Sequence, residues 1–253
     1  MLVDKKNHTV RTLALLILLM TSLSGCASNS NWRTASRESM GIAPTPEEEP
    51  RAIVQVYAAR AFGWRGSFAV HTWIATKEEQ AATYTTYHVT AWGLRSSDST
   101  IMISQDIPDR RWYGADAYLV TEIRGDSAKA AIPKIIKAAK DYPNKSIYRA
   151  YPGPNSNTFI SYILRRTPEI SVELPPHAIG KDWIEEGSLF AFTESGTGVQ
   201  FSTFGLFGFS LGLAEGLEVN LLAMTFGIDL WRPALKLPFV GRVGFQDAPA
   251  FQP

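Results

Sequence analysis

One stretch of this chain combines residue types that could carry out acyl transfer. Residues 151–159 read YPGPNSNTF, and the Pro-Gly-Pro turn delivers Asn155 and Ser156 to the start of a predicted helix. The first turn of a helix has free backbone N–H groups and the positive end of the helix dipole. A hydroxyl at this position has oxyanion donors beside it, so Ser156 is the candidate nucleophile.

A serine nucleophile needs a base, because its hydroxyl must lose a proton in the transition state. Two histidines lie upstream on predicted strands, His71 within SFAVHTWIA and His88 within ATYTTYHVTAW. We predict His71 as the base and His88 as the side chain that orients it. The helix-start N–H groups would bind the oxyanion.

Each of these residues also has a structural interpretation. Ser156 or Asn155 would serve as the helix N-cap, a role that contributes about 1 kcal/mol. His71 shares a strand face with Trp73 and could stack on its ring as a half-buried packing residue. His88 has the same alternative on its own strand. Catalytic and structural roles both remain open at this point.

A site that binds a ligand without turnover would use polar and aromatic groups near the same helix start. The candidate binding residues are Asn155, Asn157, Tyr151 and Trp73, joined by His177. His177 lies in the loop sequence PPHAIG, where it would line the rim of a cleft.

No metal or cofactor is predicted. The histidines at 71, 88 and 177 lack the H-x-x-x-H or H-E-x-x-H spacing of zinc sites. The glycines from Gly196 onward do not form G-x-G-x-x-G between a strand and a helix, so a nucleotide site is not predicted either.

The single cysteine of the chain marks a lipid-attachment signal. Residues 23–26 read LSGC, and they follow the basic residues Lys5 and Lys6 and an apolar run at 13–20. A charged segment, a short apolar segment and small residues before a cleavage site form a secretory signal. A membrane-spanning helix would need about 20 apolar residues. We therefore predict that residues 1–25 are a signal peptide and that Cys26 is acylated.

Acylation of Cys26 would place the chain in the cell envelope, with a membrane as its first partner. It would also use the one thiol of the chain. The signal resembles those of Gram-negative lipoproteins, in which a residue such as Ala27, rather than aspartate, favours the periplasmic face of the outer membrane. Loss of residues 1–25 removes three of 25 basic and one of 24 acidic residues, leaving a net charge of −1. A chain with this net charge has no excess of basic residues with which to bind nucleic acid.

The rest of the chain divides by composition. Residues 26–50 are rich in Ser, Pro and Glu, which predicts a flexible tether. A folded core is expected over 51–190 and an extension packed on it over 191–253. Within the core, residue types and periodicity predict four strands and then two helices. The strands are expected at 53–59, 67–75, 82–92 and 117–123, and the helices at 127–140 and 156–166.

The C-terminal third alternates apolar residues with small or polar ones. Residues 199–213 keep one parity, residues 214–216 supply a turn, and residues 217–230 continue on the other parity. This pattern predicts one long, glycine-rich β-hairpin. Charges such as Glu215 and Glu218 are too frequent for a lipid-facing span, so the hairpin should pack on the core or touch the bilayer surface.

The sequence NSNTF, preceded by Tyr148, resembles the N-C-x-x-F segment of circularly permuted papain-like domains, which include lecithin–retinol acyltransferase-like proteins, PPPDE peptidases and relatives of the NlpC peptidases. In those families a strand histidine comes first, a second polar strand residue follows, and a cysteine at a helix start comes last. The order His71, His88, Ser156 matches this arrangement, with serine in place of cysteine. The resemblance implies a permuted papain-like fold.

A second resemblance covers most of residues 52–244. The run from Tyr151 through LPPHAIGKD at 174–182 to GRVG at 241–244 resembles a bacterial family known as domain of unknown function 3750. This resemblance implies an envelope protein of undetermined activity.

These observations predict an α+β fold, in which a small antiparallel sheet packs on the helix that bears NSNTF and a C-terminal β-hairpin is added. The predicted function is that of a membrane-anchored envelope lipoprotein that binds an envelope peptide, glycan or lipid. The alternative is a serine-dependent amide or ester hydrolase, or an acyltransferase, that uses Ser156 and His71.

Overall fold

The structure is a computed structural model of the chain, and it describes residues 31–185 and 188–245. The chain divides into two units, Met1–Thr34 and Ala35–Pro253, and both sheets belong to the second. The predicted signal peptide and Cys26 lie outside the described residues. None of the helices in the described ranges has the length and apolar character needed to cross a bilayer.

The first sheet has five antiparallel strands in the order β4-β3-β2-β1-β5. Its inner strands β1 and β2 are buried along almost their whole length, because both faces of the sheet are covered there. A short 3-10 helix, η1 (Gly63–Ser67), joins β1 to β2, and α2 (Gly93–Ser96) follows β3. The strands are β1 (Ile53–Arg60), β2 (Val70–Lys77), β3 (Thr85–Val89), β4 (Ile101–Gln105) and β5 (Ala117–Arg124).

Two helices cover one face of this sheet. α3 (Asp126–Lys140) packs against β1 and β5, and α4 (Ser156–Leu164) packs against β2 and β3. α3 buries only the side that carries its alanines and isoleucines, as expected of an amphipathic helix, whereas every residue of α4 is buried. The main core therefore lies between the helices and the strands, where Val54 and Ile74 share a cluster with Phe159.

The opposite face of the first sheet is covered by part of the predicted tether. Ala35, Met40 and Ala43 pack against an aromatic cluster of the sheet. Asp109 fixes this segment, because its carboxylate accepts hydrogen bonds from Ser39 Oγ (2.8 Å) and from the backbone N–H of Ile42 (2.6 Å). From Ala35 onward, this stretch belongs to the folded unit.

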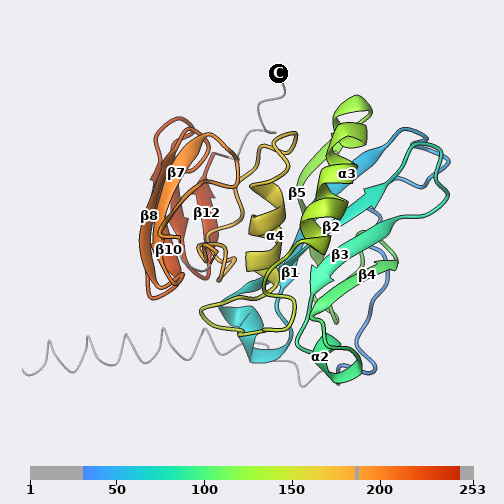
Figure 1. Cartoon of the computed structure of the whole chain (residues 1–253), viewed down its shortest axis with the longest axis horizontal. Coiled ribbons are helices and arrows are strands. Elements are labelled where there is room, and N and C mark those ends of the chain that lie inside the picture. The colour runs from blue at the N-terminus through green and yellow to red at the C-terminus, as the bar shows by residue number, and fades with distance from the viewer. Residues whose placement is uncertain (1–30, 186–187, 246–253) are drawn as a thin grey trace, which may run out of the picture. The chain divides into compact units, whose positions relative to one another are not determined.

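The second sheet has seven antiparallel strands in the order β12-β11-β10-β9-β8-β7-β6, so each strand pairs with its neighbour in the chain. In Figure 1 it forms the orange-to-red layer. Its strands are β6 (Phe190–Phe192), β7 (Gly198–Thr203), β8 (Phe207–Gly212), β9 (Gly216–Leu221), β10 (Met224–Asp229), β11 (Ala234–Leu237) and β12 (Gly241–Gly244).

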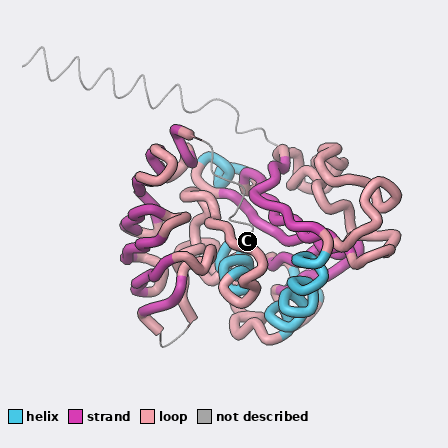
Figure 2. The backbone as a smooth tube through the Cα atoms, turned by 90° about the horizontal axis from the view of Figure 1, so that it is seen from above, coloured by secondary structure: helices cyan, strands magenta, loops and turns pink. Residues whose placement is uncertain are grey.

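α4 lies between the two sheets (Figure 1), and Figure 2 shows the strands as two separate groups with this helix between them. On its side toward the second sheet the contacts are polar. The Ser161 hydroxyl donates to Glu194 Oε1 (2.6 Å), and Arg165 Nη2 donates to Gln200 Oε1 of β7 (2.5 Å). Hydrogen bonds and ion pairs therefore attach the second sheet at this point.

The predicted α+β fold, with a papain-like sheet packed on one helix, is wrong. The described chain is mostly β, with antiparallel sheets of five and seven strands. The predicted single hairpin over 199–230 is four strands of the larger sheet, because each half folds back on itself. In the first half Thr203 pairs with Phe207, so the turn keeps the odd-residue parity and leaves no break in the alternation.

Candidate functional site

Asn155 is the N-cap of α4, as the structural interpretation proposed. Its Oδ1 accepts hydrogen bonds from the backbone N–H groups of Asn157 (2.9 Å) and Thr158 (3.2 Å), and the Thr158 hydroxyl accepts from the Asn155 N–H in return. Its Nδ2 donates to the carbonyls of Ile179 and Ala150. The side-chain oxygen and nitrogen of Asn155 are thus both engaged within the protein.

Asn157 joins the helix start to the first sheet. Its Oδ1 accepts from the Thr72 hydroxyl (2.9 Å), and its Nδ2 donates to the carbonyls of Val70 (3.0 Å) and Ile179 (2.8 Å). All of these partners are protein groups at a buried junction. Asn157 therefore fixes α4 to β2 and to the PPHAIG loop, which leaves little capacity for a ligand.

Ser156 lies between these two asparagines as the first residue of α4, and it lines a cavity of about 420 Å³ that we call the helix-start pocket. Burial raises the pKa of the neighbouring Tyr148 phenol, and interaction with the Ser156 hydroxyl partly opposes this rise. The pocket is also lined by Phe62, Arg65, His71 and Trp112. The structure therefore brings the predicted nucleophile and the predicted base to one pocket.

The two strand histidines, however, lie on the face of the sheet opposite α4. Residues alternate along β2, and Val70 and Thr72 face the helix while His71 faces the other side. The His71 ring stacks on Trp112, with centroids 3.6 Å apart and an interplanar angle of 8°. His88 meets His71 edge to face, with centroids 5.6 Å apart.

No hydrogen bond among the described residues joins Ser156, His71 and His88 as a catalytic triad would require. The buried atoms His71 Nε2 and His88 Nδ1 have no hydrogen-bond partner. Burial lowers the pKa of His71 well below its usual value, with the nearby His88 adding to the effect. Burial, helped by Arg110, lowers the pKa of His88 to about 3. Both rings are therefore neutral near pH 7, and they pack as aromatic groups.

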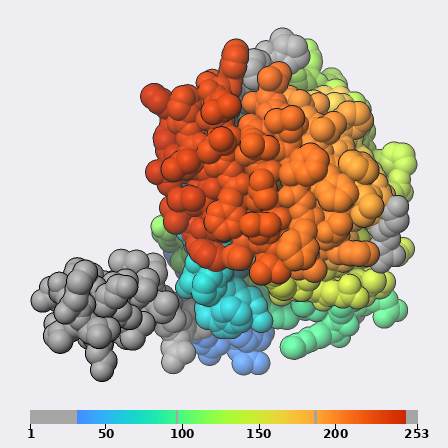
Figure 3. All heavy atoms as spheres, turned by 90° about the vertical axis from the view of Figure 1, so that its left-hand side faces the viewer, coloured from blue at the N-terminus to red at the C-terminus, as the bar shows by residue number. Residues whose placement is uncertain are grey.

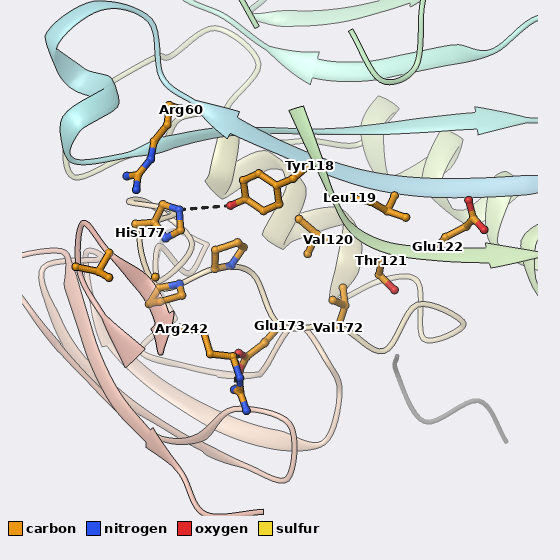
Figure 4. Close-up of a pocket in the computed structure, with 14 residues that line it drawn as sticks. Arg60, Tyr118, Leu119, Val120, Thr121, Glu122, Val172, Glu173, His177 and Arg242 are labelled. Carbon is orange, nitrogen blue, oxygen red and sulfur yellow. Dashed lines mark hydrogen bonds and ion pairs between the residues drawn. The ribbon is translucent and has the colours of Figure 1, made fainter. Parts of the chain in front are cut away.

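A larger cavity of about 630 Å³, the inter-sheet pocket, lies between the two sheets (Figure 4). β5 forms one wall, the loop around 172–177 the second and β12 the third. Aliphatic side chains form much of its surface, namely Leu119, Val120, Val172 and Val240. A cavity of this size and character can hold a small ligand.

Polar groups gather at one end of the inter-sheet pocket. The Tyr118 hydroxyl lies 3.4 Å from His177 Nε2, and the Arg60 guanidinium points toward the same ring (Figure 4). Burial, helped by Arg60, lowers the pKa of His177 to about 4. A Cβ on Gly241 would lie 3.1 Å from His177 Cε1, so glycine allows β12 to approach the ring closely.

Two nitrogen atoms of these groups lack hydrogen-bond partners among the described residues. Arg60 has a buried Nη1 atom without a hydrogen bond, and its side chain forms no ion pair there. His177 Nδ1 is also buried without a partner. The predicted rim residue His177 therefore does line a pocket. Arg60 and Tyr118 were missed, because they lie near strand ends in no recognisable motif.

The two remaining predicted binding residues have other contacts. The Tyr151 hydroxyl donates to the carbonyl of Leu222 (2.8 Å), and its side chain is half exposed at the surface. The Trp73 indole donates to the carbonyl of Pro108 (2.7 Å) within the aromatic cluster of the first sheet. Neither residue lines one of the two pockets.

A model of one protein family matches residues 51–183, more than half of the chain. The chain belongs to the family described as Protein of unknown function (DUF3750). No curated protein and no solved structure matches it.

The DUF3750 match includes the first sheet, α3, α4 and the PPHAIGKD segment, and it ends at Trp183 before the second sheet begins. The expected extension of the family to 244 is not part of the match. The helix-start pocket lies wholly within the DUF3750 region, whereas β12 completes the inter-sheet pocket from outside it. No group of three or more His, Cys, Asp or Glu side chains in the described part of the chain could hold a metal ion.

Proposed function

We propose that this protein is a lipid-anchored envelope protein that binds a small acidic ligand in the inter-sheet pocket without turning it over. The observation that carries this proposal is the guanidinium of Arg60, which is partly buried in the pocket without a counterion among the described residues. Placing an arginine away from water without an anion costs free energy. A bound carboxylate or phosphate would supply the missing partner.

The carboxylates in the pocket wall do not fill this role. Glu122 accepts from Gln55 Nε2 (2.6 Å) and from Arg124 Nε (2.5 Å). Glu173 forms an ion pair with Lys236. Each acid thus has its own partner, which leaves Arg60 available to a ligand.

His177 is suited to bind the same ligand through a hydrogen bond, because its low pKa keeps the ring neutral near pH 7. If the Tyr118 hydroxyl donates to His177 Nε2, the ring proton lies on Nδ1, which then donates to the ligand. The aliphatic walls around Val120 and Val240 would contact an apolar part of the ligand. The ligand class is therefore an acid that carries a hydrocarbon group.

Calorimetric titration with butyl phosphate tests the proposal, with 1-butanol as the uncharged counterpart. Arg60→Met should weaken butyl phosphate binding by roughly 10- to 100-fold, because a charge-assisted hydrogen bond is worth about 1.5–3 kcal/mol. Arg95→Met, at an exposed arginine of α2, should leave binding unchanged. Equal binding of the two probes to the native chain, or full binding by Arg60→Met, would reject the site.

The lipid anchor is supported by the LSGC sequence at 23–26 and by the signal-like segment before it. We expect Cys26→Ser to abolish labelling by a fatty-acid analogue and to release the chain from membranes. Unchanged labelling would disprove the anchor. With Ala27 after the cysteine, fractionation should find the native chain with the outer membrane.

A serine-dependent hydrolase or acyltransferase is the second candidate, because Ser156 and His71 line the same pocket. Its weakness is the stacking of His71 on Trp112, on the sheet face away from α4. Labelling with a fluorophosphonate, which reacts with activated serine nucleophiles, tests whether Ser156 is catalytic. Labelling of the native chain that is lost in Ser156→Ala would favour catalysis, and absence of labelling would remove it.

A further inference from the structure

One face of the seven-stranded sheet, which we call the outer face, is apolar from edge to edge. The strand register places one apolar residue of each strand directly beside one of the next strand. This row is Phe192, Val199, Leu211, Leu217, Ile228, Leu235 and Val243. A second row, two residues further along the strands, is Phe190, Phe201, Phe209, Val219 and Phe226.

These side chains are exposed. Exposed fractions in the two rows run from 40% at Val219 to 72% at Phe192, with Phe201 partly buried between its neighbours. Figure 3 looks onto this layer, and residues of the sheet (orange to red) fill most of the view. Six strand spacings make the outer face roughly 29 Å wide. Neither row contains a charged residue, and so large an apolar surface marks an interaction site.

The inner face of the same sheet is polar and buried. The row that faces α4 and the 172–182 loop consists of Gln200, Ser210, Glu218, Gly227, Lys236 and Arg242. Lys181 Nζ and Lys236 Nζ both contact the Glu218 carboxylate, at 2.7 and 3.3 Å. A sheet that borders water normally buries its apolar face and exposes its polar one. The reversal here indicates that the outer face does not border water.

We propose that the outer face docks on the lipid bilayer in which the chain is anchored. This inference rests on the proposed acylation of Cys26. Eight residues lie between Cys26 and Ala35, where the folded unit begins, and the nine extended residue steps from one to the other span at most about 32 Å. The folded unit would thus be held beside the membrane, which favours weak surface contacts by raising their effective concentration.

A bilayer fits this face better than a protein partner does. Protein interfaces carry about one hydrogen bond per 100–200 Å² and a polar rim that fixes orientation. The rows of the outer face offer only hydrocarbon and aromatic groups, and contact with lipid chains needs no directional bonds. The turn after β10 also exposes Leu230 and Trp231, and tryptophan is enriched at membrane interfaces.

The lone cysteine makes a direct test possible. If Cys26 is acylated, a cysteine introduced elsewhere is the only free thiol. Val219→Cys places it at the centre of the outer face, and Ile136→Cys on α3 is a matched control because Ile136 is an apolar residue with 44% exposure. Both acylated variants are labelled with bimane and reconstituted into phosphatidylethanolamine–phosphatidylglycerol vesicles with brominated acyl chains.

Bimane at 219 should lose at least half of its fluorescence to the brominated chains, whereas bimane at 136 should be unaffected. Equal quenching at both positions, or none at 219, overturns the proposal. A second copy as occupant would instead give concentration-dependent energy transfer at 219 without bromine quenching, which also overturns it. The chain without an engineered cysteine should take no label; labelling at Cys26 would show that the anchor itself has failed. Circular dichroism checks that both variants are folded.

Discussion

Three adjacent polar residues at the start of α4 have three different environments. Asn155 caps the helix, Ser156 lines a pocket, and Asn157 ties the helix to β2. The sequence NSN shows that polar atoms are needed here, but it does not distinguish a cap from a nucleophile. The distinction depends on Val70, Thr72 and Ile179, which are remote in sequence, so it could not be made without the structure.

Substitutions at neighbouring positions should reveal this difference. Asn157→Ala removes the side-chain hydrogen bonds to Thr72 and Val70 and one of the two donors to the Ile179 carbonyl, so the free energy of unfolding should fall by about 2–4 kcal/mol. Ser156→Ala, which removes neither the cap nor the tie, should cost less than about 1 kcal/mol. Urea denaturation of both variants measures the contrast, and similar losses at 156 and 157 would contradict the assigned roles.

The buried histidines make stability depend on pH. The pKa of His88 is about 3 in the folded chain and about 6.5 in an unfolded one, so above pH 6.5 neither state binds the proton. Between pH 6.5 and 3 only the unfolded state binds it. The free energy of unfolding should therefore fall with decreasing pH, by about 1.4 kcal/mol per unit for each such histidine.

Urea midpoints at pH 7.5, 6.0 and 4.5 measure this loss. His177, with a folded pKa of about 4, should behave in the same direction down to that pH. Replacing His88 by glutamine should remove about one proton from the slope between pH 6 and 4.5. A slope unchanged in His88→Gln would show that this ring is protonated in the folded protein.

At the scale of elements, periodicity located four of the five strands of the first sheet and both long helices, because each forms one continuous pattern. The edge strand β4 (Ile101–Gln105) was missed. β1 at Ile53–Arg60 and α3 at Asp126–Lys140 confirm the predicted 53–59 and 127–140. The seven-stranded sheet could not be counted in this way. The turn after β7 preserves parity, and the turn after β9 consists of Leu222 and Ala223, which carry none of the usual turn chemistry.

That second turn provides a test of the strand count. Leu222 and Ala223 have φ values of 53° and 58°, a conformation that two-residue hairpins usually assign to Asn-Gly. The double change Leu222→Asn and Ala223→Gly should therefore raise the free energy of unfolding by about 1 kcal/mol. Leu213→Asn, at an exposed leucine with negative φ, is the control for loss of apolar surface. Thermal melts that show no gain over this control would contradict the turn.

At the scale of the whole folded unit, the two sheets contribute different surfaces. The first sheet buries an apolar core under α3 and α4, whereas the second is attached through polar groups and presents its apolar side outward. Hydrophobic alternation reports which residues share a face, and that information is in the sequence. Which of the two faces is turned inward depends on what lies opposite each one, so alternation alone left open whether the predicted hairpin packs on the core or touches the bilayer surface.

The buried ion pairs that attach the second sheet should contribute measurably to stability. Lys236 is fully buried, its ammonium pairs with Glu173 and Glu218, and it donates to the carbonyl of Glu215 (2.6 Å). Lys236→Met removes one of the two cations that each of these buried acids contacts, because Glu218 keeps Lys181 and Glu173 keeps Arg242. We expect a loss of about 3 kcal/mol in the free energy of unfolding. Lys140→Met, at an exposed lysine of α3, should change it by less than about 0.5 kcal/mol. Guanidinium denaturation distinguishes the two, and equal small effects would contradict the buried ion-pair attachment of the second sheet.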